Sequence, residues 1–241
     1  MSFSLFERYV KNDWAEELMS EFELEANSTK LQELNDNVLS KYREANERPV
    51  YPCCKRDIFK AFNLTTFANT KVVIMGQEPY HDDNACGLCF SVCTGRPLTR
   101  SLHKISTVLL NDIDYSIPQN NGCLESWASQ GVLLLNVFLT VGQEACSHEN
   151  LGWDTFTDIV LKKLNDKPTP VFFLLWGTKA GNKSLLIDEG KYIKSYHPSQ
   201  RKNYDSPREG YVNFCDENHK PFSRANDFLE ENGLKPIDWR L

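Results

Sequence analysis

Polar side chains follow each of four short apolar runs in this sequence. The carboxylate of Glu78 and the amide of Asn136 come after the first two runs, and the hydroxyl of Thr178 and the imidazole of His197 come after the last two. A side-chain amide both donates and accepts hydrogen bonds, and a neutral imidazole can donate one to an oxygen that gains negative charge. Together with a carboxylate, such groups suit electrostatic catalysis on a polar organic substrate.

Several common chemistries lack the residues that they need. The sequence has no G-x-G-x-x-G, G-x-x-x-x-G-K-[ST] or G-x-S-x-G segment for dinucleotides, nucleoside triphosphates or a serine nucleophile. A glycosidase of sugar polymers needs two facing carboxylates, and Glu78 is the only one at these positions. Cys86, Cys89 and Cys93 have a spacing that a metal site could use, but no second C-x-x-C pair accompanies them. We therefore expect neither a metal nor another cofactor.

The apolar runs that must position these residues are typical of buried strands. Each is about five residues long and rich in branched or aromatic side chains. They cover Lys71 to Met75, Val132 to Leu135, Val171 to Leu175 and Tyr192 to Tyr196. Helical character is found in Asp13 to Phe22, Ser28 to Asn46, Ser101 to Asp112, Leu124 to Gln130, Thr155 to Leu164, Lys179 to Asp188 and Ser223 to Asn232.

This alternation predicts a single α/β domain over residues 1–241, with a short, four-stranded, mostly parallel sheet flanked by helices. Residues 1 to about 50 form its helical N-terminal part. Because ligands bind beyond the carboxyl ends of parallel strands, we expect the polar residues to meet at one edge of the sheet. Two local predictions are a helix N-cap at Ser28 and a further extended segment over Gly87 to Cys93, with alternate residues on opposite faces.

Composition narrows the setting. No apolar run is long enough to span a bilayer and no signal peptide is evident, so we expect a cytoplasmic monomer that binds no membrane. The eight cysteines are then expected to be reduced thiols. A net charge of −6 is unusual for a nucleic-acid-binding protein, so DNA binding would need a local basic patch. The candidate patch is Lys191 to Lys202.

An ordered set of short motifs resembles one known family. GQEPYH, GLCFSV, LESWASQGVLLLN, LGWDTFTD, VFFLLWG, YHPS and PIDW follow one another between about Tyr51 and Trp239. In this order and spacing they resemble the main uracil-DNA glycosylase family. The resemblance implies an enzyme that acts on single- or double-stranded DNA and hydrolyses the N-glycosidic bond of deoxyuridine. Its product is an abasic site, the first step of base excision repair. No lysine lies among the motifs to form a Schiff base, so we expect no strand cleavage.

The resemblance also implies a pocket for the extruded base. Asn136 matches the amide that pairs with the polar edge of uracil, and Phe90 matches the ring that stacks on the base. Tyr80 matches the side chain that crowds C5 and so refuses the methyl group of thymine. The backbone of Gln77 lines the pocket, and His197 stabilises the uracil anion as it leaves. Taken alone, Phe90 could be a core residue, Asn136 a turn cap and His197 structural, but the ordered motifs favour the functional interpretation.

The catalytic carboxylate departs from the family pattern. The usual motif is GQDPYH, whose aspartate orients water and stabilises positive charge on the sugar, whereas this sequence has Glu78, about 1.5 Å longer. Ser101, Thr178 and Ser199 match segments that grip DNA phosphates. Arg201 stands where the family has a leucine that wedges into the base stack, and we expect Arg201 to fill that space, or alternatively Tyr204.

Two alternatives remain open on the sequence. The change to Glu78 would also suit a catalytically weakened protein that binds DNA or a replication partner. A pure binding protein has no need of a base pocket, which Asn136, Phe90, Tyr80 and His197 would build. The second alternative is a glycosylase of shifted specificity that acts on another deaminated base.

Overall fold

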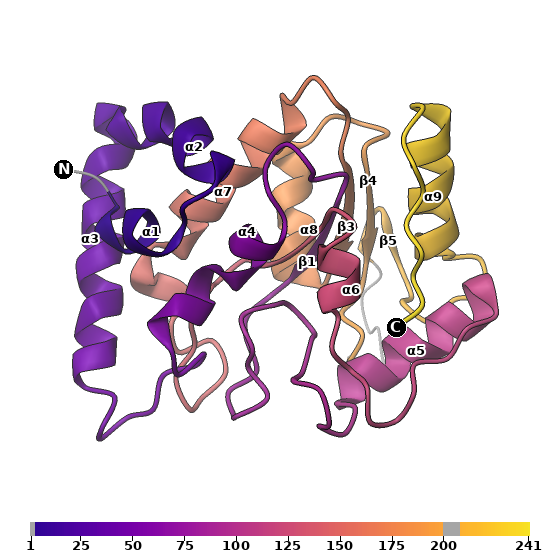
Figure 1. Ribbon diagram of the computed structural model, residues 1–241, viewed down its shortest axis with the longest axis horizontal. Coiled ribbons are helices and arrows are strands. Elements are labelled where there is room, and N and C mark those ends of the chain that lie inside the picture. Colours follow the sequence, from indigo (N-terminus) through magenta and orange to yellow (C-terminus); the bar gives the residue numbers. More distant parts are fainter. Residues whose placement is uncertain (1–2, 200–207) are drawn as a thin grey trace.

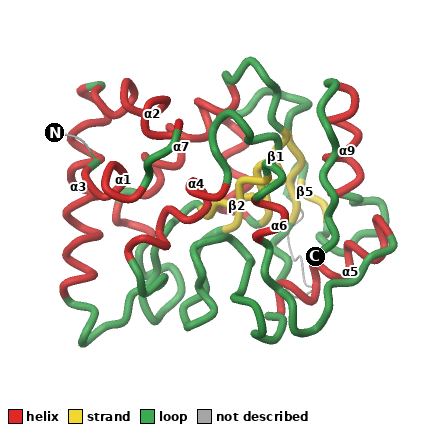
Figure 2. Tube along the Cα trace, viewed as in Figure 1, coloured by secondary structure: helices red, strands yellow, loops and turns green. Residues whose placement is uncertain are grey.

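A computed structural model describes residues 3–199 and 208–241 of the chain. Its centre is one sheet in the order β2-β1-β3-β4-β5, and all neighbouring strands are parallel. The strands are β1 (Val72–Gly76), β2 (Val132–Asn136), β3 (Phe172–Trp176), β4 (Tyr192–Ser195) and β5 (Tyr211–Val212). Helices lie on both sides of the sheet (Figure 1; Figure 2). This arrangement explains why β1, β2 and β3 are buried along their whole length and consist almost entirely of apolar residues.

The helices divide into two layers. On one side lie the N-terminal helices with α7, and on the other lie α5 and α9 (Figure 1). Their bounds are α1 (Ser4–Tyr9), α2 (Asp13–Glu23), α3 (Glu25–Arg43), α4 (Lys60–Leu64), α5 (Arg100–Ile113), α6 (Glu125–Ala128), α7 (Trp153–Asn165), α8 (Thr178–Asn182) and α9 (Pro221–Glu231). None of the helices in the described ranges is long and apolar enough to cross a membrane.

Aromatic rings join the N-terminal helices to the rest of the core. Phe3 and Phe6, both buried, pack edge-on or tilted against Phe156 of α7, with ring centroids 5.3 and 5.5 Å apart. Phe6 also meets Phe22 of α2 at 5.3 Å. These rings and the buried strand residues form one hydrophobic cluster, so the N-terminal helices belong to the same core as the sheet. Burial of one such ring contributes about 1.5–3 kcal/mol to stability.

The predicted α/β architecture is confirmed, with differences in detail. The four predicted strands are present within one residue of their expected bounds, and the two-residue strand β5 adds a fifth at the edge. Helix α3 begins at Glu25 rather than after Ser28, so the predicted N-cap is wrong. The extended segment over Gly87 to Cys93 is also wrong. It is a loop in which the five consecutive residues 88–92 are all buried, because Phe90 adopts a left-handed conformation that breaks the alternation.

Candidate functional site

A cavity of about 430 Å³ lies beyond the carboxyl ends of the strands, where the sequence placed the site. Its walls come from the segments that follow β1, β2 and β4 and from the start of α5. The lining residues include Gln77, Glu78, Tyr80, Phe90, Ser101, Asn136, His197 and Ser199. Eight of the ten site residues predicted from sequence therefore meet in one place.

Gly76, the last residue of β1, lies against both the Asn136 amide and the Phe90 ring. It pairs in register with Asn136, the last residue of β2. A Cβ atom at Gly76 would lie 2.7 Å from the Asn136 Oδ1 atom and 3.0 Å from the Phe90 ring. Only a residue without a side chain therefore lets the amide and the ring face the cavity together. Among the described residues, no hydrogen bond uses the side chain of Asn136, which leaves its amide free for a ligand.

The Phe90 ring is held by its backbone and by two neighbouring rings. Phe90 has a φ of 61°, a conformation that costs a non-glycine residue about 1–3 kcal/mol. The hydroxyl of Tyr80 donates a hydrogen bond to the Phe90 carbonyl oxygen at 2.9 Å. The ring packs at 5.3 Å from Trp176 and at 5.5 Å from the imidazole of His197. A strained backbone with this much support is typical of a functional position.

The imidazole of His197 is neutral and has a defined tautomer. Burial lowers its pKa from 6.5 to about 4. The backbone N–H of Ser199 donates to the His197 Nδ1 atom at 3.1 Å, and the Ser199 hydroxyl lies 2.9 Å from the same atom. Because Nδ1 accepts a hydrogen bond, the proton resides on Nε2, which can donate to a ligand. Gly177, with a φ of 101°, permits this packing, since a Cβ there would lie 3.2 Å from the His197 ring.

The Glu78 carboxylate is held by a loop distant in sequence. The backbone N–H of Cys146 donates to its Oε2 atom at 2.9 Å, and the Gln77 amide donates to its Oε1 atom at 3.3 Å. Burial raises the pKa of Glu78, and these two hydrogen bonds oppose the rise. Cys146 has a φ of 61°, so a strained residue aims its N–H at the carboxylate. The sequence offered no signal for this contact, because it depends on the placement of a loop 68 residues away.

Comparison with known proteins agrees with this geometry. The family model of the uracil DNA glycosylase superfamily matches residues 62–230. The chain is 43% identical over 235 residues to a uracil-DNA glycosylase of Desulfitobacterium hafniense, covering 96% of this chain and 97% of that protein. It is 44% identical to a Bacillus cereus uracil-DNA glycosylase, covering 98% of each. The chain belongs to the uracil-DNA glycosylase superfamily. A crystal structure of a mimivirus UNG variant in complex with UGI superimposes with a TM-score of 0.83 at 25% identity, covering 98% of this chain and 90% of that one.

Tyr80 and Ser101 both line the base cavity of this protein. The Tyr80 hydroxyl, besides its bond to Phe90, lies 2.7 Å from the Thr99 hydroxyl, and this pair fixes the tyrosine ring beside the cavity. Thr99 is also the N-cap of α5, because its hydroxyl accepts from the Leu102 N–H. Ser101 is buried in the first turn of α5, where backbone N–H groups favour an anion.

Other predicted positions fall elsewhere. Thr178 begins α8 and does not line the cavity, and its carbonyl accepts from the Tyr211 hydroxyl at 3.4 Å. Arg201 and Tyr204 lie outside the described residues. Of the candidate basic patch, Lys191 lies at the amino end of β4, at the edge of the sheet opposite the cavity, and pairs with Asp188 at 2.8 Å.

The cysteines form no common site. All eight are free thiols, and Cys86 and Cys89 donate to the carbonyl oxygens of Ser91 and Ile74. Among the described residues, no group of three or more histidine, cysteine or acidic side chains could hold a metal ion.

Proposed function

We propose that this protein hydrolyses the N-glycosidic bond of deoxyuridine in DNA, releasing uracil and leaving an abasic site. The observation that carries the proposal is the convergence of Asn136, His197 and Glu78 on one cavity from three different strand ends. An unpaired amide, a neutral imidazole and a half-buried carboxylate are the groups that this reaction requires. Excision of uracil in this way begins base excision repair.

In this proposal the cavity binds uracil after the nucleotide has rotated out of the DNA stack. The Asn136 amide pairs with the imide edge of the base, because it offers both donors and acceptors at one end of β2. Phe90 stacks on the base, and the backbone of Gln77 lines the pocket. Tyr80, held by Phe90 and Thr99, lies where the C5 methyl group of thymine would need space.

The proposed chemistry breaks the bond between C1′ and N1 and forms a bond between C1′ and a water oxygen. Uracil leaves as an anion, and its oxygen accepts a hydrogen bond from the Nε2–H of His197. Glu78 orients the water, accepts its proton and stabilises positive charge on the sugar. A neutral His197 suits this role, since its low pKa keeps the ring uncharged at pH 7, and the Nε2–H of an uncharged imidazole is too weakly acidic to be transferred to the weakly basic anion.

We further propose that Glu78 replaces the usual aspartate without loss of the water site. Its longer side chain is supported by the bond from Cys146 and the bond from Gln77, which together hold both carboxylate oxygens. Ser101 at the start of α5 and Ser199 beside His197 would bind phosphates on either side of the extruded nucleotide. Thr178, at the start of α8, and Arg201, which lies outside the described residues, are proposed as further DNA contacts.

The test uses end-labelled single-stranded and duplex DNA with one uracil, in the presence of EDTA, followed by alkaline cleavage of abasic sites. The wild-type protein should give one cut band on each substrate. Glu78→Gln, which keeps the shape and loses the charge, should lower the rate at least 100-fold, and Glu78→Asp should retain activity. No band from folded wild-type protein would overturn the proposal and favour a DNA-binding module, whereas release of a different deaminated base would favour the shifted-specificity alternative.

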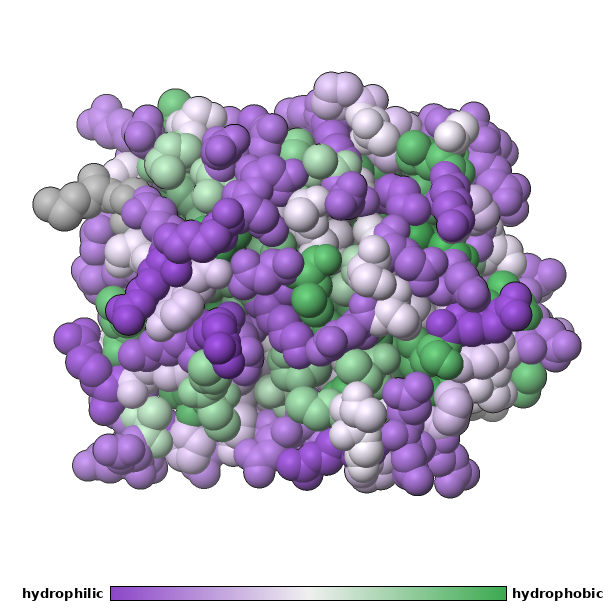
Figure 3. Space-filling model, viewed as in Figure 1, coloured by the Kyte–Doolittle hydropathy of each residue, from purple (hydrophilic) through white to green (hydrophobic). Residues whose placement is uncertain are grey.

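We also propose that the protein acts as a monomer in the cytoplasm. Its eight free thiols are suited to a reducing compartment. On the face shown in Figure 3, hydrophobic residues are scattered among hydrophilic ones, as on a surface that does not form a permanent interface.

A further inference from the structure

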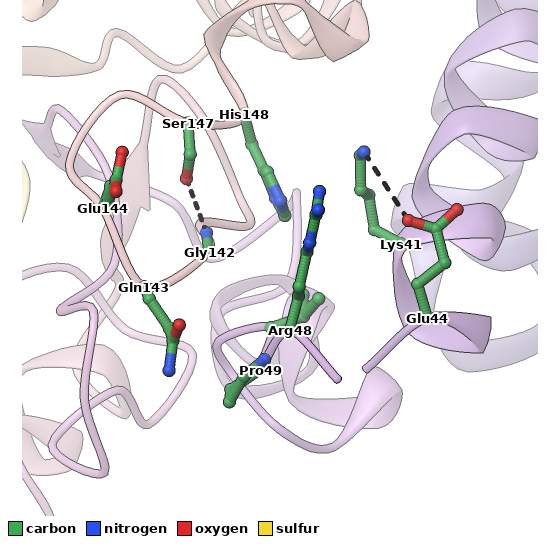
Figure 4. A pocket seen from close by; sticks show the side chains of 10 residues that line it. Lys41, Glu44, Arg48, Pro49, Gly142, Gln143, Glu144, Ser147 and His148 are labelled. Carbon is green, nitrogen blue, oxygen red and sulfur yellow. Dashed lines mark hydrogen bonds and ion pairs between the residues drawn. The ribbon is translucent and has the colours of Figure 1, made fainter. Parts of the chain in front are cut away.

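A second cavity, of about 350 Å³, lies between the end of α3 and the loop that follows β2 (Figure 4). Lys41, Glu44, Arg48, Pro49 and Val50 form one wall, and Gly142, Gln143, Glu144, Ser147 and His148 form the other. The two walls are joined by an antiparallel bridge between Tyr51 and Val141, with N–H···O distances of 2.8 and 2.9 Å. None of the residues assigned to uracil excision lines this cavity.

Three nitrogen-bearing side chains converge in it. Figure 4 shows the Arg48 guanidinium group in the middle of the cavity, with the His148 ring and the Lys41 ammonium group facing it from two sides. Glu44 lies 4.0 Å from Lys41, at the limit of an ion pair, and the Glu144 carboxylate points away from the three (Figure 4). Within the described part of the chain, Arg48 forms no ion pair. This leaves two cations and a ring facing the same space.

His148 adds a buried donor. The Trp153 Nε1–H donates to the Thr140 hydroxyl oxygen at 2.8 Å, and that oxygen lies 3.0 Å from His148 Nδ1. Thr140 is fully buried, and its own O–H is satisfied only if it donates to Nδ1. The proton of the imidazole then resides on Nε2. His148 is 4% exposed, and its Nε2 has no partner among the described residues, so this N–H is directed into the cavity.

Burial, reinforced by the charge of Lys41, lowers the pKa of His148 to about 4, so the ring is a neutral donor at pH 7. The cavity therefore offers a buried N–H donor and two cations, of which Lys41 lies beside the Glu44 carboxylate and Arg48 has no acidic partner among the described residues. A planar guanidinium group with further N–H donors around it fits the tetrahedral oxygens of a phosphate.

We infer that this cavity binds a backbone phosphate of the DNA strand that contains the uracil, one to three nucleotides from the extruded residue. The inference rests on the proposed function and adds a contact to it. The loop over residues 142–148 lies between the two cavities, since Ala145 lines the base site and its neighbours line the second cavity. Cys146 contacts the Glu78 carboxylate at 2.9 Å, and His148 follows two residues later, within about 10 Å of it. Phosphates of one strand recur every 3.4 Å along the helix axis, so the strand reaches the cavity within a few nucleotides.

The experiment measures kcat/KM for uracil release on two sets of DNA. The first set compares a long oligonucleotide with a minimal one that lacks flanking phosphates. The second replaces one phosphate at a time by a neutral methylphosphonate. Arg48→Ala should lower kcat/KM about 10-fold on long DNA and leave the minimal substrate unchanged. Lys41→Ala should have a smaller effect in the same direction, and Lys30→Ala, on the exposed face of the same helix, should have none.

One methylphosphonate position should lower the activity of wild type but not that of Arg48→Ala, because the contact is already lost in the variant. The slope of log Kd against log salt should also fall by about 0.7–0.9 for Arg48→Ala. Equal losses on long and minimal DNA, or no loss on either, would overturn the inference. Binding of inorganic phosphate at His148, seen by NMR, with unchanged DNA kinetics in Arg48→Ala would also overturn it, because the cavity would then serve a free anion. Activity of wild type on the minimal substrate tests the proposed function separately from this contact.

Discussion

The tight packing of Gly76 against the Asn136 amide and the Phe90 ring yields a quantitative prediction. A methyl group in Gly76→Ala would lie 2.7 Å from the Asn136 Oδ1 atom and 3.0 and 3.1 Å from two carbon atoms of the Phe90 ring. Ordinary contact begins at 3.4 Å, so the amide must retreat by about 0.7 Å. Phe90 is backed by Trp176 at 5.3 Å, so the adjustment falls on the Asn136 side chain and moves its amide out of position for the base.

Displacements of about 1 Å at a reacting centre can cost about 100-fold in rate. We therefore expect Gly76→Ala to lower kcat/KM by about 30- to 100-fold, equivalent to about 2–3 kcal/mol of transition-state stabilisation. The effect on stability should be small, because Gly76 has an ordinary strand conformation and the clash is confined to the cavity.

The assay is uracil release under single-turnover conditions, with thermal unfolding measured on the same samples. A double-mutant cycle with Asn136→Ala supplies the control. If the methyl group acts through the amide, Gly76→Ala should cost much less in the Asn136→Ala background than in wild type. Wild-type kcat/KM in Gly76→Ala, or a loss that tracks unfolding, would refute the reasoning.

Three further predictions follow from the same geometry. Tyr80→Ala should release thymine, and its selectivity for uracil over thymine should fall roughly 10- to 200-fold. Tyr80→Phe keeps the ring and should still refuse thymine. Equal selectivity of the two variants in a base-release assay would contradict this. Because activity needs an ionised Glu78 and burial raises the pKa of that carboxyl, kcat/KM should fall as the pH drops through a midpoint above 4.5. Gln77→Leu, which removes one hydrogen bond to the carboxylate, should move that midpoint upward, and an unmoved midpoint in the pH profile would count against the contact. The imidazole of His219 is buried, and neither ring nitrogen has a hydrogen-bond partner among the described residues. Burial lowers its pKa from 6.5 to about 4, so the unfolded form binds a proton first as the pH falls. His219→Phe should therefore unfold at a denaturant concentration similar to that of wild type at pH 7. At pH 5 its free energy of unfolding should exceed that of wild type by about 2 kcal/mol. The same stability difference between variant and wild type at both pH values would refute the linkage.

The strands were predictable because their burial on both faces demands continuous apolar runs, and the order of strands and helices then placed Asn136 and His197 at one edge. Strand β5 was not predictable, since two residues carry no period. The start of α3 was misjudged because Ser28 is a favourable N-cap, whereas the helix begins at Glu25 without any side-chain cap.

The supports of the site escaped prediction for a different reason. The contacts of Glu78 with Cys146 and of Tyr80 with Thr99 join segments whose separation in space is set by the whole fold. The left-handed conformation of Phe90 is held by tertiary packing, and its apolar neighbours alternate as they would in a strand. The support of His197 by Ser199 was within reach, because the two residues are only two positions apart in the sequence and a neutral imidazole needs a partner on its second nitrogen.

Direct detection of the released base tests whether the cavity excises uracil. Wild-type protein would be incubated with uracil-containing DNA and with matched thymine-containing DNA, and free bases would be separated by chromatography and identified by mass. We expect free uracil equal in amount to the abasic sites formed, no free thymine, and little uracil from Glu78→Gln. Intact uracil-containing DNA after prolonged incubation with folded protein that binds it would contradict the account, because Asn136, His197 and Glu78 would then form a binding site without catalysis.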